Sequence, residues 1–238
     1  MTIRIRDLCF GYGGDPLFDR FSADLGDGGA GRPLVILGPS GCGKTTLLKL
    51  LGGLLEPQSG EINFSGKAAF MFQESRLLPW FTVLENIAIP LEKDFGKEEA
   101  RAVARRFLAL VFLAEKEAAF PADLSGGQAQ RVSMARAFAW PAQALFMDEP
   151  FQSLDISLRL NLMDMCLSLN KVERRLFVAV THDPREAIYM GSRIIIMGGA
   201  GRGIVFDRTI DLAPEDRSYG SPRAAELERE MIQCLSAT

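Results

Sequence analysis

No run of apolar residues in this sequence approaches the roughly 18 to 20 that a helix needs to cross a bilayer. The first six residues alternate between polar and apolar side chains and lack the apolar segment of a signal peptide. Cysteine is scarce: the four cysteines lie far apart, without the paired spacing of a zinc site or a disulfide framework. Free thiols suit a reducing compartment, so we expect a protein that starts and stays inside the cell.

An excess of charge of one sign is also lacking. The net charge of −3 provides no basic surplus for non-specific binding to nucleic acid, so we expect no nucleic-acid partner. With 47% apolar and 24% charged residues, the composition is that of a folded soluble protein and excludes disorder. The 238 residues suit one large domain or a domain with a lobe.

The sequence does contain a glycine-rich stretch between an apolar run, 34–37, and a helical pattern, 46–55. Strand, glycine-rich loop and helix are the context of a phosphate-binding P-loop. Glycines let backbone N–H groups approach a polyphosphate, and the positive end of the helix points at the same anion. A lysine supplies charge for the β- and γ-phosphates, and a threonine hydroxyl can ligate Mg²⁺. The predicted nucleotide-binding residues here are Gly38, Pro39, Ser40, Gly41, Cys42, Gly43, Lys44, Thr45 and Thr46.

Cys42 differs from the other cysteines because the P-loop places it at a helix N-terminus beside Lys44. Both neighbours should lower the pKa of its thiol. We expect alkylation of Cys42 to block nucleotide binding and ATP to protect it. Cys42 could have a regulatory role; the alternative is that it merely occupies a loop position that tolerates many residues.

Strand and helix patterns alternate along most of the chain. Alternation predicts N-terminal strands around Ile3–Leu8 and Leu17–Leu25. Apolar runs predict further strands at 34–37, 61–64, 68–72, 144–147, 176–181, 194–197 and 203–206. Helical spacing or cap signals predict helices at 97–113, 126–140, 156–170, 184–190 and 221–235. Strands alternating with helices indicate an α/β fold with a mainly parallel sheet.

The stretch between residues 74 and 140 has no convincing strand and reads as a helical insertion. We therefore predict a single domain over 1–238 with three parts. Residues 1–73 and 141–206 form the catalytic α/β core, 74–140 a helical subdomain, and 207–238 a C-terminal tail with an amphipathic helix.

Two acidic residues, Asp148 and Glu149, end the buried strand 144–147. Asp148 is placed where a carboxylate would hold the Mg²⁺ shell, and Glu149 could polarise an attacking water. A strand that ends in acidic residues is common, so this pattern alone is moderate support.

A second helix start lies at Leu124–Gln128. Ser125 can cap a helix over 126–140, and Gln128 occupies the capping-box position. Gly126 and Gly127 are poor helix formers, which makes sense if something must approach the N–H groups there. Because one nucleotide already has its phosphates in the P-loop, we expect this helix start to complete the site of another copy.

Taken in order, these motifs resemble those of an ABC-type ATPase from about residue 3 to residue 197. The matching motifs are Gly38–Thr45, Gln73 after its strand, Leu124–Gln128, Asp148-Glu149, Ser153-Leu154-Asp155 and His182. In that family two such domains face each other head to tail and enclose two ATP molecules. The resemblance implies a P-loop NTPase core with N-terminal antiparallel strands and an inserted helical subdomain.

The resemblance also implies roles around the nucleotide. Tyr12 resembles the aromatic that stacks on adenine. The alternative interpretation is an ordinary aromatic residue in a hairpin. Gln73 resembles the residue that touches Mg²⁺ and the attacking water, so the implied metal ligands are Thr45, Gln73 and Asp148. The implied catalytic residues are Glu149 as the base, His182 as the switch histidine, Lys44 and Gln73.

The remaining implied contacts cross to a second copy. Ser125 and Gly127 resemble the signature contacts to the opposite γ-phosphate, within a stretch that includes Gly126 and Gln128. Asp155 resembles a residue that crosses the interface. Ala129 departs from the family pattern, because a basic or larger residue usually follows the signature.

The stretch Phe72–Trp80, followed by Thr82–Asn86, is most similar to the nitrate, sulfonate and taurine importer branch. That branch implies an ATP- and Mg²⁺-dependent ATPase subunit, peripheral on the cytoplasmic face of the inner membrane. Its implied partners are a second copy, separate permease subunits and, indirectly, an extracytoplasmic solute-binding protein. The apolar cluster Leu77–Phe81 either packs into the helical lobe or receives a short permease helix, and we favour the second.

Other functions stay open at this point. An exporter ATPase or a vitamin-precursor importer of the same family differs little in sequence. A soluble ABC ATPase that acts on nucleic acid is less favoured, because such relatives carry long coiled-coil insertions or two fused cassettes. A small-molecule kinase that shares only the P-loop would leave Leu124–Gln128 unexplained.

Overall fold

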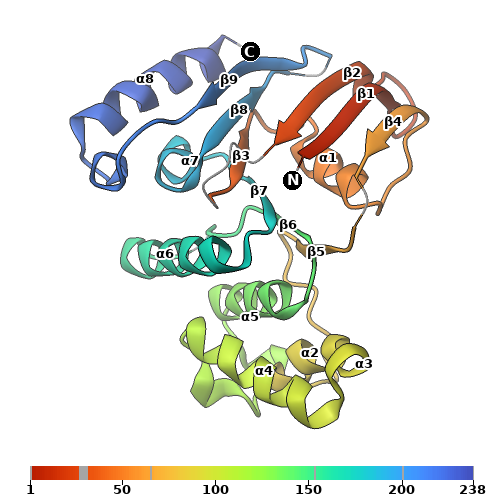
Figure 1. Cartoon of the computed structure of the whole chain (residues 1–238), viewed down its shortest axis with the longest axis vertical. Helices are drawn as coiled ribbons and strands as arrows, with labels where there is room; N and C mark the ends of the chain where they lie inside the picture. The colour runs from red at the N-terminus through yellow and green to blue at the C-terminus, as the bar shows by residue number, and fades with distance from the viewer. Residues whose placement is uncertain (1, 27–31, 65, 153, 200, 238) are drawn as a thin grey trace. The chain divides into compact units, whose positions relative to one another are not determined.

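The computed structural model describes residues 2–26, 32–64, 66–152, 154–199 and 201–237 (Figure 1). Contacts divide the chain into two compact units, which we treat separately. The first unit is formed by Met1–Gly66 with Leu167–Thr238, and the second by Lys67–Cys166. The predicted subdivision into core, helical subdomain and tail stays a prediction.

The first unit begins with a three-stranded antiparallel sheet in the order β2-β1-β4 (Figure 1). Its strands are β1 (Thr2–Phe10), β2 (Phe18–Gly26) and β4 (Ser59–Asn63). Ile3, Ile5 and Leu8 of β1 are buried, as the alternating pattern predicted. The predicted N-terminal antiparallel strands are therefore confirmed.

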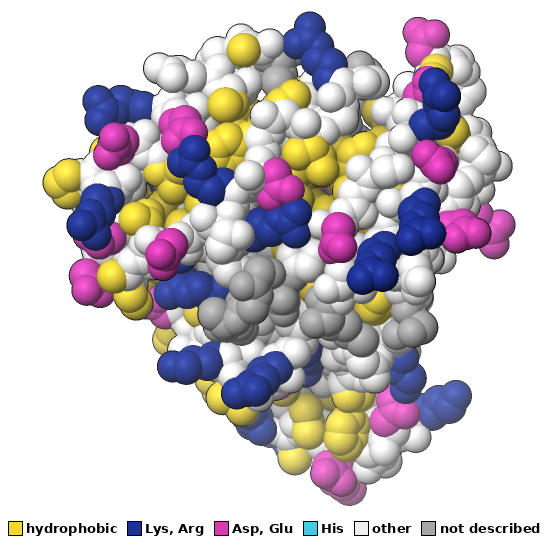
Figure 2. Space-filling view, turned by 45° about the horizontal axis from the view of Figure 1, so that its top comes forward, with side chains coloured by type: hydrophobic (Ala, Val, Ile, Leu, Met, Phe, Trp, Pro, Cys, Tyr) yellow, Lys and Arg dark blue, Asp and Glu magenta, His cyan; other side chains and the backbone are white. Residues whose placement is uncertain are grey.

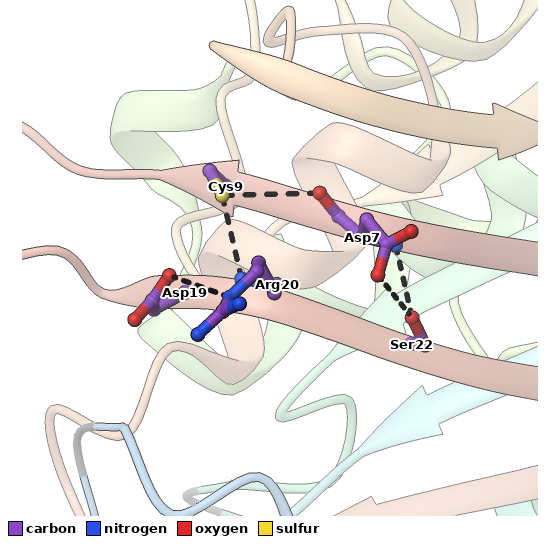
Figure 3. A network of polar contacts seen from close by, with 5 residues as sticks. All are labelled: Asp7, Cys9, Asp19, Arg20 and Ser22. Carbon is purple, nitrogen blue, oxygen red and sulfur yellow. Dashed lines mark hydrogen bonds and ion pairs between the residues drawn. The ribbon is translucent and has the colours of Figure 1, made fainter.

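Figure 3 shows polar contacts in the stretch of β1 and β2 where the pairing register shifts. Asp7 and Arg20 have positive φ angles of 47° and 49° there, so local N–H groups leave the regular ladder. The Asp7 N–H donates instead to Ser22 Oγ at 2.9 Å, and the Arg20 N–H to Cys9 Sγ at 3.3 Å. These side-chain acceptors satisfy the bulged backbone.

The first unit also contains the strands that carry the P-loop. Strand β3 (Leu34–Leu37) pairs in parallel with β7 (Leu176–Val180) and β8 (Arg193–Met197), and β9 (Ile204–Thr209) is antiparallel to β8. Every residue of β3 and β7 is buried, which is typical of parallel strands covered on both faces. Helix α1 (Lys44–Leu51) follows β3, and α7 (Pro184–Met190) packs on β3.

The last helix, α8 (Pro222–Ser236), packs on α7, β8, β9 and the 3₁₀ turn η4 (Pro214–Arg217). Of the apolar residues that the sequence places at four-residue steps on this helix, Leu227 and Met231 are buried and Leu235 is partly exposed. Ion pairs join Arg208 to Glu230, Arg185 to Glu228 and Arg223 to Asp216. In the upper part of Figure 2, side chains of both charge signs lie among hydrophobic ones.

The second unit consists of a parallel strand pair and a group of helices (Figure 1). Strand β5 (Ala68–Met71) pairs with β6 (Ala144–Asp148). The helices are α2 (Val83–Ala88), α3 (Glu92–Phe95), α4 (Lys97–Leu110) and α5 (Gly126–Ala139), with 3₁₀ turns η1 (Ile89–Leu91), η2 (Ala114–Lys116) and η3 (Pro121–Asp123). Helix α5 packs on β5, α2 and α4. As predicted, residues 74–140, all of which the structure describes, contain no strand.

Helix α6 (Ile156–Glu173) begins in the second unit and ends in the first. Among the helices that the structure describes, none is both long enough and apolar enough to cross a membrane.

Candidate nucleotide-binding and catalytic site

The P-loop connects the buried strand β3 to helix α1 by a turn whose backbone strongly favours glycine at two points. Gly41 and Gly43 have φ angles of 81° and 100°, in the left-handed region. A Cβ atom on Gly43 would lie 2.9 Å from Phe18 Cζ, whereas a Cβ on Gly41 would meet no atom within 4 Å. The loop is thus packed against β2 at Gly43 and open at Gly41.

The start of α1 has no side-chain cap. Gly43 is the N-cap residue and provides no side-chain acceptor for the first-turn N–H groups. Such donors, together with the helix dipole, form an anion-binding site. Lys44 Nζ donates to the main-chain oxygens of Gly38 at 2.8 Å and Pro39 at 3.0 Å, so its charge is held against the same loop.

Tyr12 lies beside the P-loop helix. Its hydroxyl is 3.2 Å from Thr46 Oγ1, and its ring meets Phe10 edge-on with centroids 5.1 Å apart. The side chain is 67% exposed, so one face of the ring is accessible. This placement beside α1 fits an aromatic that stacks on a base.

His182 follows β7 at the carboxyl ends of the parallel strands, where the P-loop also lies. Ile36 of β3 is in register with Val180 of β7, so Gly38 and His182 each lie two residues beyond a paired position. The Thr181 N–H donates to Ile36 O at 3.2 Å, and Asp183 caps α7 by accepting from the Arg185 N–H. His182 itself is exposed. The first unit therefore brings together Tyr12, the P-loop and His182.

In the second unit, predicted site residues likewise follow two neighbouring parallel strands. Met71 of β5 is in register with Met147 of β6, so Gln73 and Glu149 both follow the carboxyl end of that strand pair. Asp148, the last residue of β6, is buried, and Glu149 is partly exposed with a positive φ of 50°. Gln73 Nε2 donates to Gln152 Oε1 at 3.2 Å.

The predicted capping box at the start of α5 is confirmed. Ser125 Oγ accepts from the Gln128 N–H at 3.3 Å, and Gln128 Oε1 accepts from the Ser125 N–H at 2.9 Å. Ser125 and Gly126 are exposed, and a Cβ on Gly126 would meet nothing within 4 Å. Gly127 is partly exposed. This helix start is accessible to an anion.

A family model described as ABC transporter matches residues 27–152, more than half of the chain. The chain belongs to the ABC transporter family. It is an ATP-binding cassette, an α/β ATPase, and it resembles the ATP-binding subunits of importers.

Curated relatives carry the same assignment. An aliphatic sulfonates import ATP-binding protein of Rhizobium johnstonii is 39% identical over 220 residues, which cover 88% of this chain and 78% of that protein. Proteins of the same description from Pseudomonas aeruginosa and Escherichia coli K12 are 41% and 39% identical, cover 87% and 86% of this chain, and are themselves covered over 76% and 80%.

A solved structure extends the likeness to the fold of this cassette. It is the dimeric structure of a post-hydrolysis state of an ATP-binding cassette bound to ADP and Pi. The TM-score is 0.79 at 27% sequence identity, and the match covers 89% of this chain and all of that one. The predicted fold class is therefore confirmed.

The reactivity predicted for Cys42 of this cassette is corrected by the structure. Cys42 is buried, with 3% of its surface exposed. Burial raises the pKa of its thiol, and this effect exceeds the lowering by Lys44 and by the N–H groups of the loop. The sequence shows the charged neighbour but not the burial, which is why the direction was predicted wrongly.

Asp155, a further predicted residue, lies at the start of helix α6. Asp155 accepts from the Leu158 N–H at 2.9 Å through Oδ1 and so caps the first turn of α6. Ser153, from the same predicted motif, lies outside the described residues. The proposed role of Asp155 toward a second copy stays a prediction.

Sequence reasoning missed Gln130 of α5, which is buried and donates through Nε2 to the main-chain oxygen of Glu149 at 2.8 Å. A signal was available: Gln130 shares a helix face with the buried residues Met134 and Ala137, so a polar side chain interrupts an apolar stripe. It also missed Asn86 and Arg136, which bond the main chain of the segment after Gln73.

The metal ligands predicted for this family remain a prediction. Among the described residues, no group of three or more His, Cys, Asp and Glu side chains could hold a metal ion by itself. The residues present fit a magnesium–nucleotide complex better, because the open P-loop turn and the uncapped α1 offer phosphate donors beside the Thr45 hydroxyl.

Proposed function

We propose that this chain is the ATP-hydrolysing subunit of an importer for aliphatic sulfonates or similarly small anions. It would act as a head-to-tail homodimer beneath separate permease subunits, at the cytoplasmic face of the membrane. The relatives described as aliphatic sulfonate import proteins support the substrate class, and the dimeric state of the similar solved cassette supports the assembly. A solute-binding protein on the other side of the membrane would deliver the solute.

The observation that carries the proposal is the presence of two separate helix starts suited to phosphate in one chain. The α1 start has an uncapped first turn with Lys44 beside it. The α5 start has exposed Ser125 and Gly126. One ATP bound by the P-loop leaves the α5 start for the γ-phosphate of an ATP held by a second copy.

Each residue then has a chemical task. Lys44 and the loop amides would neutralise charge that develops on the β- and γ-phosphates, and the partner's signature serine would do so from the other side. Tyr12 would stack on adenine. Thr45, Gln73 and Asp148 would hold Mg²⁺, which, when bound, withdraws charge from the phosphate oxygens.

Proton transfer would rest on Glu149 and His182. Glu149, at the end of β6, would orient the attacking water and accept its proton, and His182 would contact the γ-phosphate. Closure of the dimer on ATP and its opening after hydrolysis would then drive alternating access in the permease. Leu78 and Trp80, 39% and 68% exposed in the segment after Gln73, would contact the permease.

The proposal is tested with Glu149→Gln, which keeps the side-chain shape and removes the base. Steady-state ATP hydrolysis should fall by roughly 10² or more, the scale of losing a general base. The ATP-induced dimer, followed by light scattering, should persist. Glu98→Gln, at an exposed position of α4, is the matched control and should hydrolyse ATP at the wild-type rate. Wild-type turnover in Glu149→Gln would refute the assignment.

The substrate class needs a separate experiment in cells. Deletion of the gene should abolish uptake of a radiolabelled aliphatic sulfonate, and the wild-type gene, but not Glu149→Gln, should restore it. Normal sulfonate uptake in the deletion strain would leave the ATPase assignment intact and contradict the substrate class.

A further inference from the structure

Glu149 has a backbone conformation that glutamate does not favour. Its φ of 50° lies in the left-handed region, which residues with a side chain seldom adopt. Such a conformation persists where the surroundings fix it, and it often occurs at functional positions. The groups that hold this peptide unit therefore decide where the Glu149 carboxylate points.

Two N–H donors converge on the main-chain oxygen of Glu149. Gln130 Nε2 donates to it at 2.8 Å, and the Gln152 N–H lies 3.4 Å away. A carbonyl oxygen has two lone pairs, so both donors can be accommodated. The shorter of the two bonds comes from a side chain that is only 7% exposed.

The position of Gln130 gives this bond a further meaning. Gln130 is the fifth residue of α5, the helix that begins at the exposed capping box of Ser125 and Gln128. On the other side, Gln152 accepts from Gln73, which leaves the neighbouring strand β5. Through the bond of Gln130, helix α5 therefore links its exposed start to the carbonyl of Glu149.

We infer that Gln130 is a positioning residue, which through its bond to the Glu149 carbonyl aligns the Glu149 carboxylate to accept a proton from the water that attacks ATP. This inference rests on the proposed function, because it assigns Gln130 a task only if Glu149 is the base. Gln130 touches neither nucleotide nor water in this scheme. Its loss should therefore lower kcat and leave ATP affinity unchanged.

The first test uses Gln130→Met in the full chain, which keeps the length of the side chain and removes the donor. We expect kcat to fall about tenfold, the effect of one lost hydrogen bond. KM for ATP should stay close to wild type. Ser133→Ala, a buried polar position three residues further along α5, is the matched control and should retain wild-type kcat.

The second test uses Gln130→Glu, because a carboxyl group can donate to the Glu149 carbonyl only when it is protonated. The ratio of its kcat to the wild-type kcat should rise as the pH falls. A role in packing alone predicts a ratio that does not change with pH.

The outcomes separate this inference from the proposed function. If Glu149→Gln is slow while Gln130→Met turns over at the wild-type rate, or the Gln130→Glu ratio is flat with pH, the positioning role is wrong and the base stands. If Glu149→Gln is itself fully active, the proposed function fails first. The double variant Gln130→Met/Glu149→Gln should be no slower than Glu149→Gln alone, because both changes act on one group.

Discussion

At the scale of single residues, Cys42 shows two opposing effects at one sulfur atom. Lys44 and the loop N–H groups stabilise a thiolate, whereas burial disfavours any charge there. Burial is the larger effect, so the pKa of Cys42 lies above the ordinary thiol value. Because the thiolate is the nucleophile, Cys42 should be slow to react at neutral pH.

This predicts the order in which iodoacetamide labels the four cysteines of the folded protein at about pH 7.5. Cys9 and Cys234, which are partly exposed, should react first, and the buried Cys42 and Cys166 last. Labelling of Cys42 should keep accelerating as the pH rises beyond the ordinary thiol range, because the thiolate forms only there. Peptide mass spectrometry measures each site, and urea-unfolded protein, in which all four react, is the control. Labelling of Cys42 as fast as Cys9 would contradict the burial argument.

At the scale of elements, the segment after Gln73 is held rigidly although it exposes apolar side chains. Asn86 of α2 donates through Nδ2 to the carbonyls of Leu78, Phe81 and Thr82, and its Oδ1 accepts from the Leu78 N–H. Arg136 of α5 donates to the carbonyls of Ser75 and Arg76. Fixed backbone with exposed Leu78 and Trp80 suits a surface that a partner contacts.

The effect of removing this support on stability should be measurable from the tryptophans of the second unit. Asn86→Ala removes the side-chain partner of the Leu78 N–H and of the Phe81 carbonyl in this part-buried segment, so we expect the free energy of unfolding to fall by about 1–3 kcal/mol. Both tryptophans, Trp80 and Trp140, lie in the second unit, so urea unfolding followed by tryptophan fluorescence reports on it. Asn161→Ala, at an exposed site of α6, is the matched control and should not lower the value. An Asn86→Ala protein as stable as wild type would show that the segment is held by other contacts.

What could be predicted from sequence follows the distance along the chain between interacting groups. The capping box joins Ser125 and Gln128, three residues apart, and was predicted; so were the strands, because burial repeats locally. Gln130 bonds a residue 19 positions away and Arg136 one 61 positions away, and neither was predicted. Local periodicity contains no information about such partners.

At the scale of the whole molecule, the central question is whether one chain is a complete enzyme. The P-loop belongs to the first unit, and the exposed α5 start belongs to the second. In the proposed two-fold dimer each copy would donate its α5 start to the nucleotide of the other. Activity then requires association, and association follows protein concentration.

We therefore expect the ATPase rate per chain to fall when the protein is diluted below its dimerisation constant at saturating ATP. Two inactive variants provide the decisive mixture: Lys44→Ala, which lacks the P-loop charge, and Ser125→Arg, which blocks the α5 start. In a mixed dimer one nucleotide site carries both changes and the other carries neither. An equal mixture forms mixed dimers in about half of all pairs, so about a quarter of the wild-type sites should be intact. A mixture no more active than its two components, together with a rate per chain that ignores dilution, would mean that each chain hydrolyses ATP alone.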